Sequence, residues 1–495
     1  LYYAQGPGRL AFASELQALR PLPGLDASVD EDALFAYFRY LCVPAPATIV
    51  KGVRKLAPGC ILRWDPDGAT IWRYWDPREV ARKGFEEPYS GSFGEAADEL
   101  ESRLKEAIKM RMLSDVPLGA FISGGVDSST VVALMQAQST ERIKTYTIGF
   151  PEATHDESIH AGAVATHLGT DHHTLMLSPG DVLHLVPEIG KYYDEPFADS
   201  SNVPTYLLSR FARQDVTVAL SGDGGDELFA GYPRYFWGAR IEGIRKALSP
   251  TGAKYLGRAL AGVPAGLWDG PAMRLGGARL AGSEGLSTRV QRLGGYLACS
   301  PDRVYEEMLS AWREPGRLIG PRAPSGIGPN LLEVGDLPWP ERMMAVDLYN
   351  YLVDDILTKV DRASMAVSLE ARVPLLDHRF VEWSWRIPRA FKMAPQGDRG
   401  KLLLREVLYR HVPRDLIERP KKGFGMPLGP WLRKELKSWA LEKLAPEGLE
   451  AAGLCPAPVI EAWEAHQRGE NRIQQLWTVL TYVQWLERWR DHRAG

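Results

Sequence analysis

The sequence has little cysteine and lacks long runs of apolar or basic residues. Its four cysteines in 495 residues lie far apart without a C-x-x-C pair, which argues against structural zinc and a disulfide framework. No apolar run approaches the ~18 residues that a membrane span needs, and the N-terminus lacks the features of a signal peptide. The formal net charge is -3, without a Lys/Arg block. We therefore expect a cytoplasmic protein that acts without membrane or nucleic acid.

The chain also lacks an initiator methionine. It starts with Leu1-Tyr2-Tyr3-Ala4, which is typical of the interior of a strand, so we expect it to begin partway through a domain. The content of 45% hydrophobic and 24% charged residues is that of a globular protein, and 495 residues are enough for two to four domains.

Two patterns divide the chain. Residues 1 to about 75 alternate short β-like runs with turn signals, which predicts a mostly antiparallel piece. From residue 96 onward, helical and strand patterns alternate, which predicts an α/β fold with a doubly wound parallel sheet. The predicted strands of this sheet are 118–122, 143–150, 172–177 and 216–220, and the predicted helices among them are 96–112 and 157–168.

The second half has fewer signals. Residues 236–340 are rich in Gly, Ala, Pro and Arg and are interpreted as a helical, loop-rich insertion. Apolar spacing predicts a helix over 341–356 and another at the C-terminus. Because Trp477, Trp485 and Trp489 follow the helical spacing of the second, we expect them in the core and not on a base-stacking surface.

The loop 123–129 is the strongest signal for function. Its sequence, Ser-Gly-Gly-Val-Asp-Ser-Ser, stands where an apolar strand runs into a helix. Glycines there allow a tight turn, serines add donors, and the helix N-terminus favours an anion, so the pattern predicts a phosphate site. The absence of a Gly-Lys-Ser/Thr ending excludes the usual P-loop. Asp127 would repel a bare phosphate, which indicates a divalent cation between them.

A second loop, 221–227, has the sequence Ser-Gly-Asp-Gly-Gly-Asp-Glu and follows the strand 216–220. The carboxyl ends of parallel strands meet at one edge of a sheet, so the two loops could hold a magnesium nucleotide between them. A pair of simple Asx turns is the alternative, but a bound cation would relieve the repulsion among three acids.

The loop 123–129 resembles the pyrophosphate loop of the ATP pyrophosphatase family. Together with Asp194-Glu195-Pro196-Phe197, the segment from Lys359 to Arg362 and the segment from Glu370 to Asp377, it resembles glutamine-dependent asparagine synthetases over essentially the whole chain. The resemblance implies that residues 1–80 are the end of an Ntn-type glutaminase domain. It also implies that residues 90–495 are a synthetase domain.

The resemblance also implies roles for single residues. Asp127 and Asp226 should hold Mg²⁺ on the pyrophosphate, and Ile122 and Ile148 should flank the adenine. The expected donors to the pyrophosphate are Ser123, Gly124, Gly125, Ser128 and Ser129, and those near adenine or ribose are Ser221 and Gly222.

Two further positions are expected to be catalytic. Asp223 stands where the family carries a carboxylate that is important for the acyl step; asparagine synthetases commonly have Glu there, so this chain departs from the pattern. Lys421 matches the lysine that stabilises charge at the phosphate, with Lys422 as the close alternative.

The implied reaction is that of an ATP-dependent carbon–nitrogen ligase: aspartate is adenylated to β-aspartyl-AMP, and ammonia then displaces AMP. In the family, glutamine supplies the ammonia through an N-terminal cysteine. This chain has no cysteine there, so we expect it to use ammonia and leave open whether it is a fragment. Homodimerisation is also left open. The alternatives are a synthetase for another carboxylate (a polysaccharide precursor, a β-lactam or a cyclised peptide) and a tRNA-modifying ATP pyrophosphatase.

Overall fold

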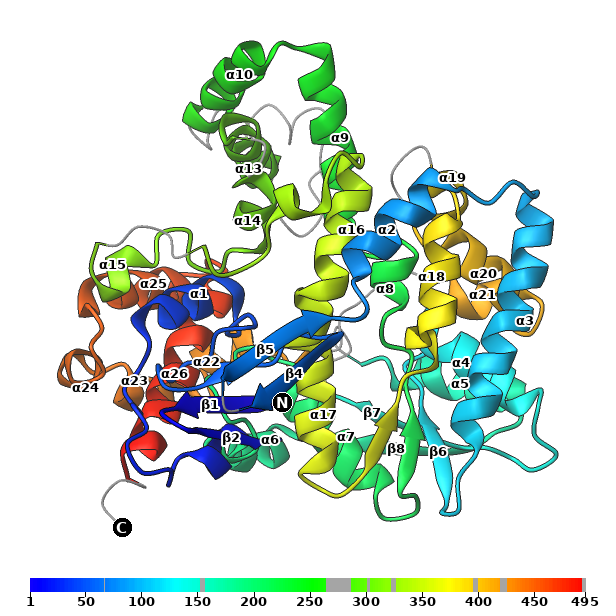
Figure 1. Cartoon of the computed structure of the whole chain (residues 1–495), viewed down its shortest axis with the longest axis horizontal. Helices are drawn as coiled ribbons and strands as arrows, with labels where there is room; N and C mark the ends of the chain where they lie inside the picture. Colours follow the sequence, from blue (N-terminus) through cyan, green and yellow to red (C-terminus); the bar gives the residue numbers. More distant parts are fainter. Residues whose placement is uncertain are drawn as a thin grey trace.

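A five-stranded sheet in the order β10-β9-β6-β7-β8 forms the centre of the larger part of the molecule (Figure 1). The structure, a computed structural model, describes residues 1–65, 67–151, 156–263, 286–300, 303–321, 326–394, 399–418 and 425–491. All neighbouring strands of this sheet are parallel, which confirms the prediction. The strands are β6 (Leu118–Phe121), β7 (Lys144–Gly149), β8 (Asp171–Met176), β9 (Val218–Leu220) and β10 (Glu370–Arg372).

Buried side chains cover both faces of the sheet, because neighbouring residues of a strand point to opposite sides. In β9, Ala219 belongs to one large hydrophobic cluster, whereas Val218 and Leu220 belong to another. The sheet is therefore doubly wound. The helices next to it include α3 (Phe93–Met112), α4 (Val126–Gln136), α5 (Ser158–Leu168), α7 (Asn202–Ala212), α17 (Thr358–Met365), α18 (His378–Arg386) and α20 (Leu402–Tyr409).

Local capping fixes where the helix before the sheet begins. Ser92 accepts a hydrogen bond from the Glu95 N–H, and the Glu95 side chain accepts one from the Ser92 N–H. This capping box satisfies two donors that the first turn of a helix would otherwise leave unpaired. The predicted helix 96–112 is thus confirmed and begins three residues earlier.

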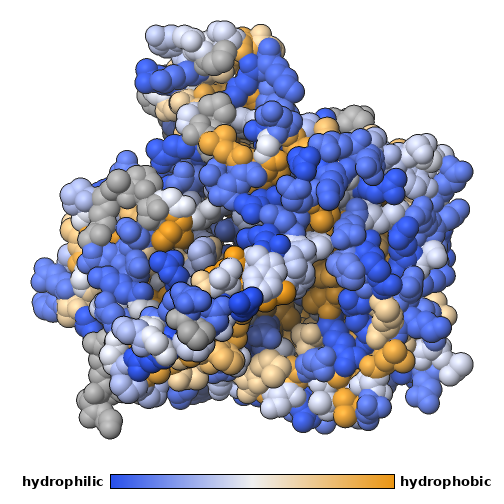
Figure 2. All heavy atoms as spheres, in the orientation of Figure 1, coloured by the Kyte–Doolittle hydropathy of each residue, from blue (hydrophilic) through white to orange (hydrophobic). Residues whose placement is uncertain are grey.

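The N-terminal part consists of short antiparallel strands, as predicted. β1 (Tyr2–Gly6) pairs with β2 (Arg9–Ala13) and with β3 (Arg54–Lys55). β4 (Cys60–Asp65) and β5 (Gly68–Arg73) form a separate hairpin. This hairpin exposes Ile61, Trp64, Ile71 and Trp72. The face of the molecule in Figure 2 is mostly hydrophilic, with several hydrophobic patches, one of them in its middle. Two helices flank these strands, α1 (Glu31–Tyr40) and α2 (Pro77–Glu86).

The region 236–340 is helical in its described parts, and α10 and α13 project from the rest of the molecule (Figure 1). Gly257 and Gly294 bring these two helices close together: a Cβ on Gly257 would lie 2.7 Å from the carbonyl oxygen of Gly294. The helices are α9 (Pro233–Ala247), α10 (Pro250–Gly262), α13 (Leu286–Ala298), α14 (Val304–Leu309), α15 (Gly316–Ile319) and, at the end, α16 (Trp339–Tyr349).

The prediction of one helix over 341–356 is wrong. α16 ends at Tyr349, and a π-helix over Leu352–Leu357 leads into α17. The wider turn buries two successive carboxyl groups, Asp354 and Asp355. Asp354 accepts a hydrogen bond from the N–H of Ala45 at 3.1 Å, so the irregular turn joins the N-terminal part to the rest. Apolar spacing alone could not indicate this.

The C-terminal helix α26 (Ile473–Asp491) is confirmed, and its tryptophans are core residues: Trp477, Trp485 and Trp489 are at most 5% exposed. None of the helices within the described ranges is both long and apolar enough to cross a membrane. The other α-helices of the described residues are α6 (Pro179–Leu185), α8 (Gly225–Leu228), α19 (Arg389–Lys392), α21 (Arg414–Ile417), α22 (Leu428–Arg433), α23 (Lys437–Lys443), α24 (Pro446–Ala451) and α25 (Pro456–Gln467).

Candidate active site

The two glycine-rich loops lie against each other because β6 and β9 are neighbouring parallel strands. The contact is between backbones: a Cβ on Gly222 would lie 2.6 Å from the backbone nitrogen of Ser128. Real Cβ contacts are never so short, so only glycine fits at this position. The predicted meeting of both loops at the carboxyl edge of the sheet is therefore present in the structure.

The first loop is held by its own serines. The backbone N–H of Ser123 donates to the Ser128 Oγ at 3.1 Å, the two hydroxyl oxygens lie 2.9 Å apart, and Gly124 turns the chain at φ +69°. Gly125 is the N-cap of α4, and no side chain caps the helix. The N-terminus of α4, with the positive end of its dipole, is therefore suited to an anion.

One lysine joins the acids of the two loops. The Nζ of Lys401 lies 2.8 Å from Oδ1 of Asp226 and also donates to Oδ2 of Asp127. The three side chains are largely buried, and the two carboxylates raise the pKa of Lys401 against the opposing effect of burial. The structure thus shows that the space between Asp127 and Asp226 accepts positive charge.

Small residues make this arrangement possible. A Cβ on Gly225 would lie 2.4 Å from Oδ1 of Asp127, and a Cβ on Gly231 would lie 1.9 Å from Oδ1 of Asp226. Lys401 itself has a left-handed backbone, with φ +59°, and its N–H donates to the carbonyl of Phe229. A strained residue held in place by its surroundings is common at functional sites.

Asp223 lies within the second loop and is held by its neighbour. The Ser221 hydroxyl donates to Oδ2 of Asp223 at 2.7 Å. Burial raises the pKa of Asp223 above its usual range, against the lowering effects of this hydrogen bond and of the positive charge of Lys359. The protonated form is therefore more accessible than in a solvated aspartate.

Lys359 approaches the same loop from α17. Its Nζ lies 2.8 Å from Oδ2 of Asp199 and 2.8 Å from the Ser201 hydroxyl. Beside this pair, burial and the negative charge of Asp199 raise the pKa of Asp355 well above its usual range. A network of buried charges around Lys359 therefore lies close to Asp223 of the second loop.

Glu227, the last residue of the second loop, is 1% exposed. Burial raises its pKa to about 8, and the charges of Asp226 and Asp347 contribute in the same direction. The Tyr232 hydroxyl donates to its Oε1 at 2.9 Å. The carboxyl group of Glu227, with its pKa close to neutral pH, thus directly follows Asp226, a predicted metal ligand, in the sequence.

The remaining predicted site residues differ in their placement. Ile122 and Ile148 are each 2% exposed and belong to the clusters on opposite faces of the sheet. Ser129 is fully buried, and within the described ranges its hydroxyl has no hydrogen-bond partner. Lys421 lies outside the described residues, as does Lys422.

Two acids of the quoted motifs connect the N-terminal part to the rest. Asp194 accepts hydrogen bonds from the N–H groups of Leu16 and Gln17, and an ion pair of 3.0 Å links it to Arg362. Glu195 pairs with Lys55 at 2.7 Å. These residues position the two parts against each other.

Sequence reasoning missed Lys401. Its only local signal is a Gly-Lys pair directly before the apolar helix α20, which is also typical of an ordinary helix start. The fold, not the local sequence, brings this lysine to the acids.

The residues fit a divalent cation by their chemistry, since two carboxylates already share one positive group and oxygen ligands are what Mg²⁺ prefers. Within the described part of the chain, Asp127 and Asp226 are not joined by a third acid, Cys or His in a cluster that could hold a metal. Phosphate oxygens of a nucleotide would have to supply further ligands.

Comparisons with known proteins agree with this site. Residues 99–490 match the asparagine synthase family, and residues 1–75 match a glutamine amidotransferase domain. The chain belongs to the asparagine synthase family, whose members are carbon–nitrogen ligases. Membership implies the use of ATP, with aspartate and with glutamine or ammonia as substrates.

Individual relatives share about a third of the sequence or less. A Mycobacterium bovis protein that is provisionally named a glutamine-hydrolysing asparagine synthetase is 33% identical, over 99% of this chain and 73% of its own length. Asparagine synthetase (glutamine-hydrolysing) 1 of Bacillus subtilis is 28% identical, over 98% and 73%. Amidase chry2 of Gibberella zeae is 24% identical, over 78% and 60%.

Proposed function

We propose that this chain converts aspartate to asparagine through β-aspartyl-AMP, with ATP and Mg²⁺. The observation that carries the proposal is the convergence of Asp127 and Asp226, from two glycine-rich loops, on one buried ammonium. A site that gathers acids and a lysine beside a helix N-terminus suits a nucleoside triphosphate with its metal.

The residues divide the work of the first step. The amides at the start of α4 and the hydroxyls of Ser123 and Ser128 would bind the pyrophosphate portion of ATP. Asp127 and Asp226 would hold Mg²⁺, which neutralises charge on the departing pyrophosphate. Lys401 would move from bridging the two acids to pairing with a phosphate oxygen, since an ammonium on a flexible stem can do both.

The second step uses the other end of the second loop. Asp223 would act where ammonia meets the activated carbonyl, in a position fixed by the Ser221 hydroxyl. Lys421 is proposed to stabilise charge at the phosphate, and Ile122 and Ile148 to border the adenine.

Ammonia is the proposed nitrogen source of this polypeptide. A glutaminase needs a reactive thiolate, and two of the cysteines are unsuited to supply one: burial raises the pKa of Cys42 well above its usual range and raises that of Cys299. Ammonium salts should therefore support asparagine formation, and glutamine should not.

The test is release of AMP and pyrophosphate from ATP with Mg²⁺, ammonium chloride and a panel of carboxylic acids. Aspartate should give the largest stimulation, with asparagine as the product. If another acid stimulates AMP release and aspartate does not, the assignment of the acceptor is wrong. Glutamate formed from glutamine by the purified chain would contradict the proposal on nitrogen.

A further inference from the structure

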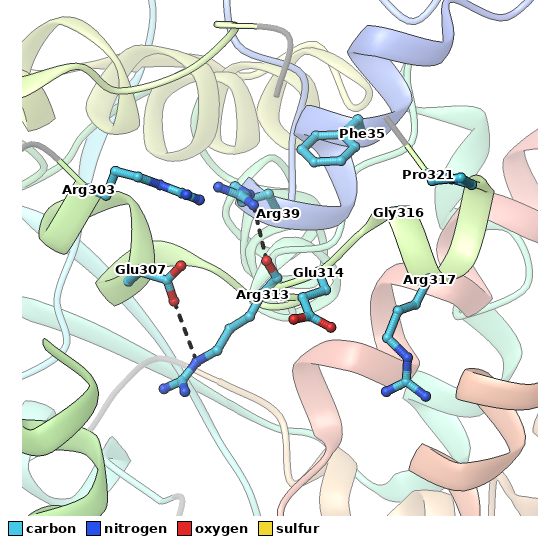
Figure 3. A pocket seen from close by; sticks show the side chains of 9 residues that line it. All are labelled: Phe35, Arg39, Arg303, Glu307, Arg313, Glu314, Gly316, Arg317 and Pro321. Atoms are coloured by element: carbon cyan, nitrogen blue, oxygen red, sulfur yellow. Dashed lines mark hydrogen bonds and ion pairs between the residues drawn. The ribbon is translucent and has the colours of Figure 1, made fainter. Parts of the chain in front are cut away.

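A cavity away from the candidate active site lies between α1 and the segment that carries α14 and α15 (Figure 3). Its volume is about 620 Å³, within the range of ordinary small-molecule sites. It shares no residue with the two loops of the candidate active site. Four arginines line it, which are Arg39, Arg303, Arg313 and Arg317.

The arginines outnumber the acids of the cavity wall, which are Glu307 and Glu314. Arg39 pairs with Glu306, just outside the wall. The pairs of the other three arginines are stretched or exposed: Arg313 reaches Glu307 at 3.7 Å, Arg303 reaches Glu306 at 3.4 Å, and Arg317 reaches Glu461 at 2.9 Å on the exposed surface. Exposed pairs contribute little and rearrange readily, so Arg303, Arg313 and Arg317 can turn to an added anion.

Arg39 is the buried anchor of this wall. Its side chain is 3% exposed, and its Nη2 donates to the carbonyl oxygen of Arg313 at 3.1 Å. Its Nε is buried and has no hydrogen-bond partner within the described ranges. Figure 3 shows Arg303 extending toward Arg39, and burial together with the positive charge of Arg303 lowers the pKa of Arg39.

A bound oxyanion would reduce the repulsion between the two arginines. Guanidinium groups bind carboxylate and phosphoryl groups through paired N–H donors, so such a group would pair with Arg303 and offset its charge beside Arg39, which Glu306 already pairs. Phe35, which the guanidinium of Arg39 faces at 5.3 Å, adds an apolar wall for the carbon skeleton of a ligand.

We propose that this cavity binds a small organic anion that carries at least two phosphoryl or carboxylate groups. A ligand in this cavity would contact both parts of the chain, because α1 lies in the part that matches the amidotransferase domain and Arg303 in the part that matches the synthase domain. The two parts already join here: Ala311 N–H donates to Arg39 O at 2.8 Å, and Trp312 N–H to Phe38 O. A bound ligand would add a third connection between the two parts.

The test is calorimetric binding to the full chain, with citrate as the carboxylate probe and fructose 1,6-bisphosphate as the phosphate probe. Saturating α,β-methylene-ATP and Mg²⁺ keep the active site occupied. At least one probe should bind with one-to-one stoichiometry, and the pair Arg303→Ala/Arg313→Ala should weaken it at least about tenfold, since each charged hydrogen bond lost costs about that factor. The side chains of Arg303 and Arg313 are 48% and 58% exposed, so the fold should tolerate their loss.

A charge-reversal variant and a control variant make the test more specific. Arg303→Glu places a carboxylate beside Arg39 and should reduce binding more than Arg303→Ala does. The matched control Arg258→Ala/Arg468→Ala removes two exposed arginines elsewhere and should bind as the wild type does. The proposal is overturned if neither probe binds the wild type, if the cavity variants bind as tightly, or if the control loses affinity equally.

Discussion

The ammonium of Lys401 lies 2.8 Å from Oδ1 of Asp226, although the two residues come from segments on opposite sides of a large helical region. Since Asp127 shares the same ammonium, Lys401 joins the two loops of the candidate active site. The lysine therefore has two expected roles, one in stability and one in binding phosphate.

The role in stability predicts a large effect of Lys401→Met. Removal of one partner from a buried ionic group leaves the other charges uncompensated, which costs roughly 3–5 kcal/mol. Added Mg²⁺ should recover much of this loss by binding the two freed carboxylates, so Mg²⁺ should raise the melting temperature of the variant more than that of the wild type. Thermal denaturation with and without Mg²⁺ measures this. The exposed Lys434→Met is the control, and an equal Mg²⁺ response in all three proteins would contradict the shared site.

The metal ligands predict loss of activation. Asp127→Asn and Asp226→Asn each remove a charged ligand of Mg²⁺, so aspartate-dependent ATP–pyrophosphate exchange should fall by at least about 100-fold while the fold is kept. The control is Asp115→Asn, which changes an exposed acid before β6. Normal ATP–pyrophosphate exchange in a folded Asp127→Asn/Asp226→Asn variant would show that these two acids are not the metal ligands.

The close approach at Gly231 predicts a steric effect. In Gly231→Ala, the new Cβ would meet Oδ1 of Asp226 and Cε of Lys401 at 1.9 and 2.2 Å, so the acid and the lysine must move apart. We expect exchange activity to fall at least about tenfold, because small displacements of catalytic groups are costly. Gly243→Ala, where a Cβ meets nothing within 4 Å, should be fully active. Equal activity of the two variants would show that this geometry is not needed.

These cases show what the sequence could predict. The parallel sheet and the two loops follow from local periodicity and from glycine and acid spacing, and these signals are strong at β6 and β9. β10 was missed because its sequence, Glu370-Ala371-Arg372, places one small apolar residue between two charged ones and has no apolar run. Lys401 was missed because its partners are set by tertiary structure: a lysine before a helix is ordinary until the fold brings two carboxylates to it.

The buried Glu227 predicts a pH dependence of stability. Its pKa of about 8 in the folded state exceeds the unfolded value near 4.3, so the folded protein binds the proton more tightly. Stability is then highest below the unfolded pKa and falls as the pH rises toward 8. Glu227→Gln removes this loss and should be stabilised relative to the wild type by roughly 3 kcal/mol more at pH 8 than at pH 5. Urea unfolding at pH 5 and pH 8 measures the free energy of unfolding of each protein, with Glu435→Gln at an exposed position as the control. If the difference in this free energy between Glu227→Gln and the wild type is the same at both pH values, the raised pKa of Glu227 is contradicted.

Asp223 gives the most direct test of the acyl step. If its carboxyl group acts where ammonia meets the activated acid, Asp223→Ala should lower kcat by at least about 100-fold and leave the ATP dissociation constant nearly unchanged, because an interaction made in the transition state appears in kcat. Asp223→Glu should keep part of the activity, since it restores the carboxylate that the family commonly carries. Ser221→Ala is the matched variant: it removes the hydrogen bond of 2.7 Å but keeps the acid, so it should cost less than Asp223→Ala. If Asp223→Ala instead weakens ATP binding at unchanged turnover, the residue serves the nucleotide loop and not the chemistry.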